Sequence, residues 1–169
     1  MKIAIISDSH DNLATLEKAL IWLNEKRIKT LIHCGDVCSP SMLKEVSRLF
    51  HGKIHLVFGN VDGDQYSMLK LKKEGKLPNV KFHGDSGELD IGGRKIAFCH
   101  KILPAKGLAA SGKYDLVFYG HDHKPWEEKM KNCRLVNPGT LAGMFNKATF
   151  AVYNTDTDKL ELILVEKLG

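Results

Sequence analysis

The sequence lacks an apolar run long enough to cross a membrane, because lysine, aspartate or glycine interrupts every apolar stretch within a few residues. The first apolar run meets Asp8 before the hydrophobic region of a signal peptide could form. The chain has only 4 cysteines, and their irregular spacing provides no disulfide framework. We therefore expect no membrane partner, reduced and buried thiols, and a cytoplasmic location.

Linkers, repeats and low-complexity segments are absent as well, and 169 residues suit one domain, residues 1–169, with a core of its own. The formal net charge is +5, but the lysines are scattered. No basic run carries the interleaved aromatic residues that are typical of nucleic-acid binding. We interpret the charge as a solvated basic surface that favours anionic ligands, and we expect no specific nucleic-acid partner.

The first half of the chain contains alternating strand and helix patterns. Strands are predicted at residues 2–7, 30–34 and 54–58. Helices are predicted after a cap at Asn12, from Pro40 as a first helical residue, and over residues 64–73. Strands that alternate with helices in this way form parallel sheets with the helices packed outside.

The second half is richer in strands, predicted at residues 87–91, 94–99, 115–119, 127–130, 134–136, 148–153 and 160–165, with one helix at residues 103–111. Gly92-Gly93 and residues 156–158 provide hairpin turns. A parallel sheet followed by antiparallel hairpins predicts an α/β fold in which two mixed sheets pack face to face. With helices on both outer faces, this is a four-layer α/β/β/α sandwich.

Polar residues follow these strands at the points where the strands end: Asp8 and His10, Asp36, Asn60, His100, and His121 and His123. Each alone has an ordinary explanation as a turn, a helix cap or an isolated histidine, although His-x-His is a stronger metal signal. It is improbable that each of these residues has a separate ordinary role, because such an explanation would have to hold at every strand end at once. Since ligand residues from distant strand ends can converge at one edge of an α/β sheet, we predict a metal site.

The donors in this set are carboxylate, amide and imidazole groups without thiolate, which suits Mn²⁺, Ni²⁺, Fe²⁺, Zn²⁺ or Co²⁺. A carboxylate can bridge two cations because each of its oxygens can face one of them. Two metals held about 3.5–4 Å apart form a recognised device for displacement at phosphorus. The other histidines, His33, His51, His55 and His83, lack such placement, and we interpret them as ordinary side chains.

The combined motifs resemble the signature of the calcineurin-like metallophosphoesterase superfamily: Asp8-x-His10, Gly35-Asp36, Gly59-Asn60-x-Asp62, His100 and Gly120-His121-x-His123. The short chain and Asn137-Pro138-Gly139-Thr140 resemble its small bacterial and archaeal phosphodiesterase branch. The resemblance implies a metallophosphoesterase-like sandwich with a binuclear metal centre. It also implies hydrolysis of phosphate diesters by a hydroxide that bridges two metals, with Mn²⁺ as the expected ion.

The resemblance also implies a role for each residue of the set. One metal is held by Asp8, His10, Asp36 and His123, and the other by Asp36, Asn60, His100 and His121, so that Asp36 bridges them. The residues expected to take part in catalysis are Asp36, Asn60 and His100. The expected substrate contacts are Asn60 and Lys101.

Three positions depart from the family pattern. Val61 stands where many members carry the histidine that protonates the leaving group, which leaves the proton donor undefined and gives Asp62 the alternative role of a helix cap. Lys101 stands where glycine is frequent, and it either adds a cation near the phosphate or narrows the pocket. Phe58 stands where an arginine often clamps the phosphate.

Two alternatives to a phosphodiesterase stay open. One is a phosphomonoesterase or nucleotidase with the same metal site, and the other is a non-catalytic interaction scaffold similar to a retromer subunit. The complete ligand set favours an enzyme over the scaffold. The expected partner is a small phosphate ester, of which a nucleotide-like ester is one form, and a homo-oligomer is left open.

Overall fold

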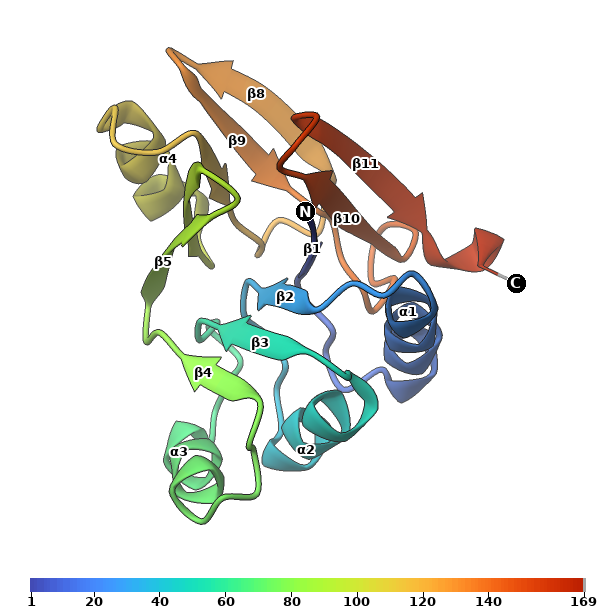
Figure 1. Ribbon diagram of the computed structural model, residues 1–169. Coiled ribbons are helices and arrows are strands. Elements are labelled where there is room, and N and C mark those ends of the chain that lie inside the picture. The colour runs from blue at the N-terminus through green and yellow to red at the C-terminus, as the bar shows by residue number, and fades with distance from the viewer. Residues whose placement is uncertain (169) are drawn as a thin grey trace.

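Short apolar runs form the strands of two mixed sheets (Figure 1) in the computed structural model, which describes residues 1–168. The first sheet contains β1 (Lys2–Ile6), β2 (Thr30–His33), β3 (Lys53–Leu56), β4 (Val80–Phe82), β10 (Thr149–Asn154) and β11 (Lys159–Leu164). The second contains β5 (Ser86–Ile91), β6 (Arg94–Cys99), β7 (Leu116–Phe118), β8 (Trp126–Met130) and β9 (Cys133–Asn137). The strand orders are β11-β10-β1-β2-β3-β4 and β5-β6-β7-β9-β8.

Helices connect these strands, and the first three begin at side-chain caps. They are α1 (Leu13–Glu25), α2 (Pro40–Leu49), α3 (Gln65–Lys73), α4 (Ile102–Ala110) and a 3-10 turn, η1 (Val165–Lys167). The side chains of Asn12, Ser39 and Asp64 accept backbone hydrogen bonds in the first turns of α1, α2 and α3. None of the helices in the described part of the chain combines the length and apolarity that crossing a membrane requires.

Three apolar clusters separate the layers of the fold. The first includes Leu20 and Met68 and fills the space between the first sheet and α1, α2 and α3. The second includes Ile32 and Phe118 and lies between the two sheets. The third includes Ala109 and packs α4 on the second sheet. Figure 1 shows α1, α2 and α3 on one side and α4 on the other, so the predicted four-layer arrangement is confirmed.

The direction of the strands decides where the chain's loops meet. β1, β2, β3 and β4 run parallel to one another, and so do β6, β7 and β9. The two predicted hairpins, residues 87–99 and 148–165, are the antiparallel pairs β5–β6 and β10–β11, and β8–β9 is a third antiparallel pair. Because β6, β7 and β9 are parallel to one another, the second sheet is mixed, as predicted. The helix α4 carries the chain back to the start of the sheet between β6 and β7, and the strand β8 does the same between β7 and β9. The pairs β6–β7 and β7–β9 are therefore parallel.

Two local features differ from the sequence prediction. The strand β4 has only three residues, too few for an alternating pattern to be visible, and it forms the edge of the first sheet. All four cysteines are unpaired, as expected, and Cys34, Cys99 and Cys133 are buried. Cys38, in contrast, is only partly buried, because it lies in the loop after β2 that reaches the surface beside His10.

A pair of histidines sits at the edge of the layer between the sheets. Nδ1 of His55 lies 2.9 Å from Nε2 of His83, and the His55 side chain is buried. Burial lowers the pKa of His55 to about 4, with further contributions from His83, Lys53 and Lys81. The folded protein therefore keeps this imidazole neutral at pH values where the unfolded chain already binds a proton.

This pair predicts a loss of stability in mild acid. The contribution of His55 to the free energy of unfolding is complete above about pH 6.5. It is lost as the pH falls toward 4, because the imidazole then binds a proton in the unfolded chain but not in the folded protein. We expect His55→Gln to reduce the difference between the unfolding free energies at pH 7 and pH 5 by about 1–2 kcal/mol. Urea unfolding measures this difference. The exposed His51→Gln variant is the control, and an equal pH dependence in wild type and His55→Gln would contradict the prediction.

Candidate metal centre

The loops that carry the predicted ligands all follow the carboxyl ends of parallel strands. From the first sheet, these residues are Asp8 and His10 after β1, Asp36 after β2 and Asn60 after β3. From the second sheet, they are His100 after β6, and His121 and His123 after β7. Because the two sheets pack face to face, these loops meet at one end of the sandwich.

Two sets of side chains converge there. In each set, ligand atoms of three residues lie within 4.8 Å of one another; the sets are Asp8, His10 and His123, and Asp36, His100 and His121. Asn60 joins the second set, since its Oδ1 lies 2.9 Å from Nε2 of His100. Each set combines residues from both sheets, so the packing of the sheets assembles both.

In the second set, the hydrogen bonds of His100 fit a bound cation. Nδ1 of His100 donates to the carbonyl oxygen of Cys34 at 2.8 Å, which places the proton of a neutral ring on Nδ1. The lone pair of Nε2 then faces Oδ2 of Asp36 at 3.2 Å and Oδ1 of Asn60 at 2.9 Å. Three electron-pair donors that face one another call for a cation between them, and an imidazole held through its other nitrogen is the usual form of a metal ligand.

The first set has the same arrangement around His123. Nδ1 of His123 donates to the carbonyl oxygen of Met144 at 3.3 Å. Its Nε2 faces Oδ1 of Asp8 at 3.3 Å and Nε2 of His10 at 3.1 Å. The donor chemistry of both sets therefore fits divalent metals, since each set presents imidazole nitrogen and carboxylate oxygen toward a common point.

The Asp36 carboxylate lies between the two sets. Its Oδ2 is 3.2 Å from Nε2 of His100 and 3.8 Å from Nε2 of His10, and its Oδ1 accepts from the backbone N–H of Val61 at 3.0 Å. Burial raises the pKa of Asp36, but the hydrogen bond and positive charge that a protonated His100 would supply, together with the hydrogen bond from the Val61 N–H, outweigh it and hold the pKa below its usual value. Asp36 therefore stays ionised, which its predicted role as a bridge between two cations requires.

The pKa values of two imidazoles in the sets, those of His10 and His100, are raised. The Asp8 carboxylate, whose Oδ1 lies 3.7 Å from Nε2 of His10, raises the pKa of that imidazole. Burial lowers the pKa of His100, but the hydrogen bond with Asp36 and its charge outweigh the burial and raise the pKa overall. Both sets thus favour a positive charge at the point where their side chains meet.

Backbone strain is concentrated in the same loops. The predicted ligands with a left-handed backbone are Asp8 (φ 53), His10 (φ 40), Asp36 (φ 60), His121 (φ 71) and His123 (φ 57). A residue other than glycine in this region costs of order 1 kcal/mol, and such residues cluster at functional sites. The fold accepts this cost because the left-handed turns aim the side chains at common points.

Asp62 holds two of the ligand loops together, a role that sequence reasoning missed. Its Oδ2 accepts from the backbone N–H groups of Asp36 at 3.0 Å and Gly59 at 2.6 Å, and its Oδ1 accepts from Cys38 at 2.7 Å. The suggested role as a helix cap is wrong, because Asp64 caps α3. Asp62 is buried, so these bonds fix the loop after β2 against the loop after β3.

His33 is a second supporting residue that was interpreted as an ordinary side chain. Its Nδ1 accepts from the backbone N–H of Gly35 at 3.2 Å, so Nε2 carries the proton and donates to Oγ of Ser9 at 3.1 Å. Burial lowers the pKa of His33 to about 4, which keeps the ring neutral and able to make both bonds. His33 therefore ties the loop after β1 to the loop after β2.

The segment after β9 braces the remaining loops. The side-chain amide of Asn137 donates to the carbonyl oxygen of Gly120 at 3.0 Å, and its Oδ1 accepts from the N–H of Gly139 at 2.9 Å. The hydroxyl of Thr140 donates to the carbonyl oxygen of Asp8 at 3.0 Å. The motif that resembled the phosphodiesterase branch thus positions loops from both sheets and presents no ligand itself.

A hollow of about 340 Å³ adjoins the second set of ligands. It is lined by Phe58, Gly59, Asn60, Asp85, Cys99, His100, Lys101 and Pro104. Lys101 and Asn60, the predicted substrate contacts, are exposed at this hollow, whereas His100 is buried. An anionic ester that occupied the hollow would therefore meet a lysine beside the metal ligands.

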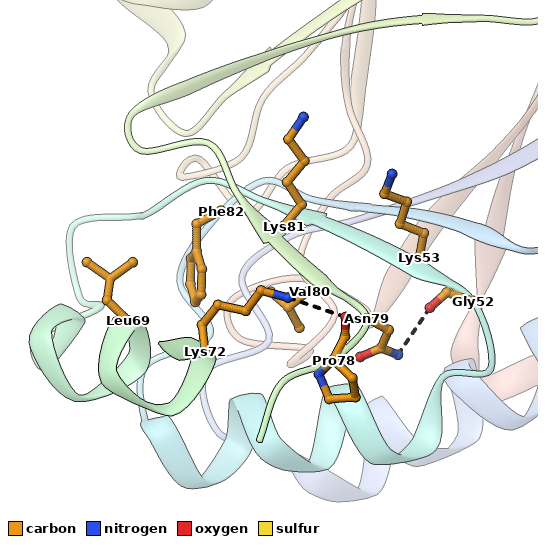
Figure 2. A pocket seen from close by; sticks show the side chains of 9 residues that line it. All are labelled: Gly52, Lys53, Leu69, Lys72, Pro78, Asn79, Val80, Lys81 and Phe82. Carbon is orange, nitrogen blue, oxygen red and sulfur yellow. Dashed lines mark hydrogen bonds between the residues drawn. The ribbon is translucent and has the colours of Figure 1, made fainter. Parts of the chain in front are cut away.

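A larger hollow, about 630 Å³, lies elsewhere, between α3 and the edge strand β4 (Figure 2). Figure 2 shows Leu69, Val80 and Phe82 around it, with the Lys72 Nζ directed to the carbonyl oxygen of Pro78. None of the predicted metal ligands lines it. Its lining of lysines, Asn79 and apolar side chains contains no carboxylate or imidazole that could hold a metal, so the smaller hollow beside the predicted ligands is the candidate for the substrate.

Comparisons with known proteins agree with this geometry. A model of the calcineurin-like phosphoesterase superfamily domain matches residues 1–158. A phosphodiesterase of Methanocaldococcus jannaschii is 31% identical over 167 residues, which cover 98% of this chain and 100% of the relative. A solved archaeal phosphodiesterase has a TM-score of 0.88 at 29% identity and covers 97% of this chain and 99% of its own. Chaetomium thermophilum Vps29, at 13% identity and a TM-score of 0.71 over 97% of this chain and 95% of its own, shares the fold.

Proposed function

The chain belongs to the calcineurin-like phosphoesterase superfamily, as its motifs predict, and from this membership we propose that it is a metal-dependent phosphodiesterase. The full-length likeness to a phosphodiesterase of Methanocaldococcus jannaschii supports hydrolysis of phosphoester bonds, and diesters in particular. The observation that carries the proposal is the convergence of lone pairs from both sheets. Each of His100 and His123 is held through Nδ1 by a backbone carbonyl and turns Nε2 toward a carboxylate.

We propose two divalent cations, of which Mn²⁺ is the expected one and Ni²⁺, Fe²⁺, Zn²⁺ and Co²⁺ are alternatives. One would be held by Asp8, His10, Asp36 and His123, and the other by Asp36, Asn60, His100 and His121. When bound, such a pair lowers the pKa of water toward neutrality and neutralises phosphoryl oxygens. Because each set takes residues from both sheets, residues 1–169 act as one functional domain in this proposal.

The chain's own residues would orient the ester. The exposed Asn60 amide stands at the mouth of the hollow, where it is able to donate to a phosphoryl oxygen through its Nδ2 while Oδ1 faces the second set. Lys101 supplies a positive charge beside His100. Val61 holds Asp36 through its backbone N–H but carries no proton donor in its side chain, which favours esters with good leaving groups.

The alternatives differ from the proposal in definite ways. A phosphomonoesterase would use the same metals with a pocket that excludes a second ester arm, whereas the full-length relative from Methanocaldococcus jannaschii is a phosphodiesterase. An interaction scaffold does not need a complete ligand set. Here, every predicted ligand either belongs to one of the two sets or, like Asn60, lies within hydrogen-bond distance of a member of one. A small phosphodiester, with nucleotide-like esters included, is therefore the proposed substrate.

Metal removal tests this proposal. Protein purified with Mn²⁺ is expected to hydrolyse bis(p-nitrophenyl) phosphate, and treatment with EDTA is expected to lower the rate by more than about a hundredfold. Metal analysis should give two ions per chain, and Mn²⁺ should raise the melting temperature because it binds the folded state. Rates with p-nitrophenyl phosphate decide between diester and monoester. Absence of metal binding and of hydrolysis with all five metals would overturn the enzyme proposal.

A further inference from the structure

The loop at residues 141–148 presents an exposed aromatic ring beside the metal centre. The Phe145 side chain is 89% exposed, although its ring centroid lies only 5.5 Å from that of His123. Phe145 also has a left-handed backbone (φ 64), which is costly for a bulky residue. The loop therefore exposes a large apolar ring to water next to a predicted metal ligand. Only a small part of the ring's surface is buried against the protein.

The position of this ring is tied to the ligand loops. The backbone N–H of Ala142 donates to the carbonyl oxygen of Asp8 at 3.0 Å, and the side-chain amide of Asn12 donates to the carbonyl oxygen of Ala142 at 2.9 Å. The neighbouring Met144 carbonyl accepts from Nδ1 of His123. These bonds hold Ala142 against the loop after β1 and Met144 against the loop after β7, so the backbone next to Phe145 is anchored at the metal centre.

We propose that Phe145 is a stacking platform for a planar arm of the substrate, a nucleobase or a similar heteroaromatic ring attached to the phosphodiester. This inference rests on the proposed function and names the class of ester. Aromatic side chains stack on nucleobases regardless of sequence, because every base has a π-face. The centre is flanked by this ring on the His123 side and by the hollow with Lys101 on the His100 side. Two flanks of different character suit the two arms of a diester.

The simpler explanation is that Phe145 only covers the His123 ring. That explanation leaves the exposure unaccounted for, because a ring that served as a cover would bury its own face as well. The exposure of the Phe145 side chain also leaves ring surface free for a ligand. The two explanations differ in one measurable respect, since only a platform makes binding depend on the base of the ligand.

The test compares two ligands that differ in the base alone, thymidine 5′-monophosphate and deoxyribose 5-phosphate. Calorimetric titration of the Mn²⁺-loaded wild-type protein is expected to show roughly tenfold tighter binding of the nucleotide. In Phe145→Ala the two dissociation constants should become equal within about twofold, and Phe145→Trp should restore the preference. Tyr66→Ala is the matched control, because it removes an aromatic ring that is 79% exposed on α3. This control should keep the wild-type preference.

The outcomes separate the platform from the other roles of the ring and from the proposed function. An equal loss of affinity for both ligands in Phe145→Ala would show that the ring only supports His123, and an unchanged preference would show that the base does not touch it. Either result overturns the inference. Hydrolysis of bis(p-nitrophenyl) phosphate is measured separately. Its absence in wild type would end the proposed function, while the ratio of the two dissociation constants would still decide the role of Phe145.

Discussion

Replacement of Asp36 by asparagine is expected to lower Mn²⁺-dependent hydrolysis of bis(p-nitrophenyl) phosphate by more than about a hundredfold and to leave the protein folded. The Oδ2 atom of Asp36 faces both His100 and His10, so this one carboxylate serves both sets of ligands. An amide at this position keeps an oxygen that can accept from the Val61 N–H, but it loses the negative charge that two adjacent cations need.

Metal analysis and thermal unfolding check this expectation without reliance on activity. The Asp36→Asn protein should retain fewer metal ions per chain, and Mn²⁺ should raise its melting temperature less than it raises that of wild type. Asp64→Asn is the matched control, because asparagine also caps a helix and Asp64 lies at the start of α3. If Asp36→Asn kept full activity and two metals, Asp36 would not be the bridging ligand.

A single methyl group at position 59 is expected to have a similarly large effect. A Cβ atom on Gly59 would collide with the carboxylate and the backbone nitrogen of Asp36, and neither can move, because Asp62 and Val61 hold them by hydrogen bonds. We expect Gly59→Ala to lower metal affinity and hydrolysis by about 10- to 100-fold. It should also destabilise the fold by about 1–3 kcal/mol, as overpacking does.

Gly63→Ala provides the control for this substitution within the same loop. The nearest atom to a Cβ at Gly63 is the carbonyl oxygen of Val61 at 4.0 Å, so the methyl group has room. This variant should keep hydrolysis and metal content within about twofold of wild type. Equal activities of the two alanine variants, measured at saturating Mn²⁺ and over a range of Mn²⁺ concentrations, would show that the Gly59 contact does not limit the geometry of the centre.

Several elements of the fold were predictable because their signals are local. Asn12, Pro40 and Asp64 mark helix starts through hydrogen bonds or backbone angles that involve only a few neighbouring residues. Gly92-Gly93 marks a hairpin for the same reason, since only the turn itself must adopt the unusual angles. The three-residue strand β4 was missed because its place at the sheet edge depends on β3.

The supporting residues of the centre were not predictable from their own surroundings in the chain. Asp62 looks like a cap for a nearby helix, and His33 looks like a residue of a buried strand. Their hydrogen bonds to Asp36, Cys38 and Ser9 join segments that are 24 to 26 residues apart in the sequence. No periodicity or short motif records such a contact, because it arises only when neighbouring strands are in register.

The sequence by itself determined the chemistry: the carboxylate, amide and imidazole donors, their positions after strand-forming runs, and the absence of an imidazole at Val61. The tertiary structure decided which donors meet. Each set of ligands takes side chains from both sheets, and the distance between strand ends of different sheets is set by the packing of the apolar layer between them. It also decided the direction of each donor, because the carbonyl oxygens that hold Nδ1 of His100 and His123 come from Cys34 and Met144, far away in sequence. Local interactions along the chain select the strand and the turn, whereas long-range packing alone brings these atoms within reach of one ion.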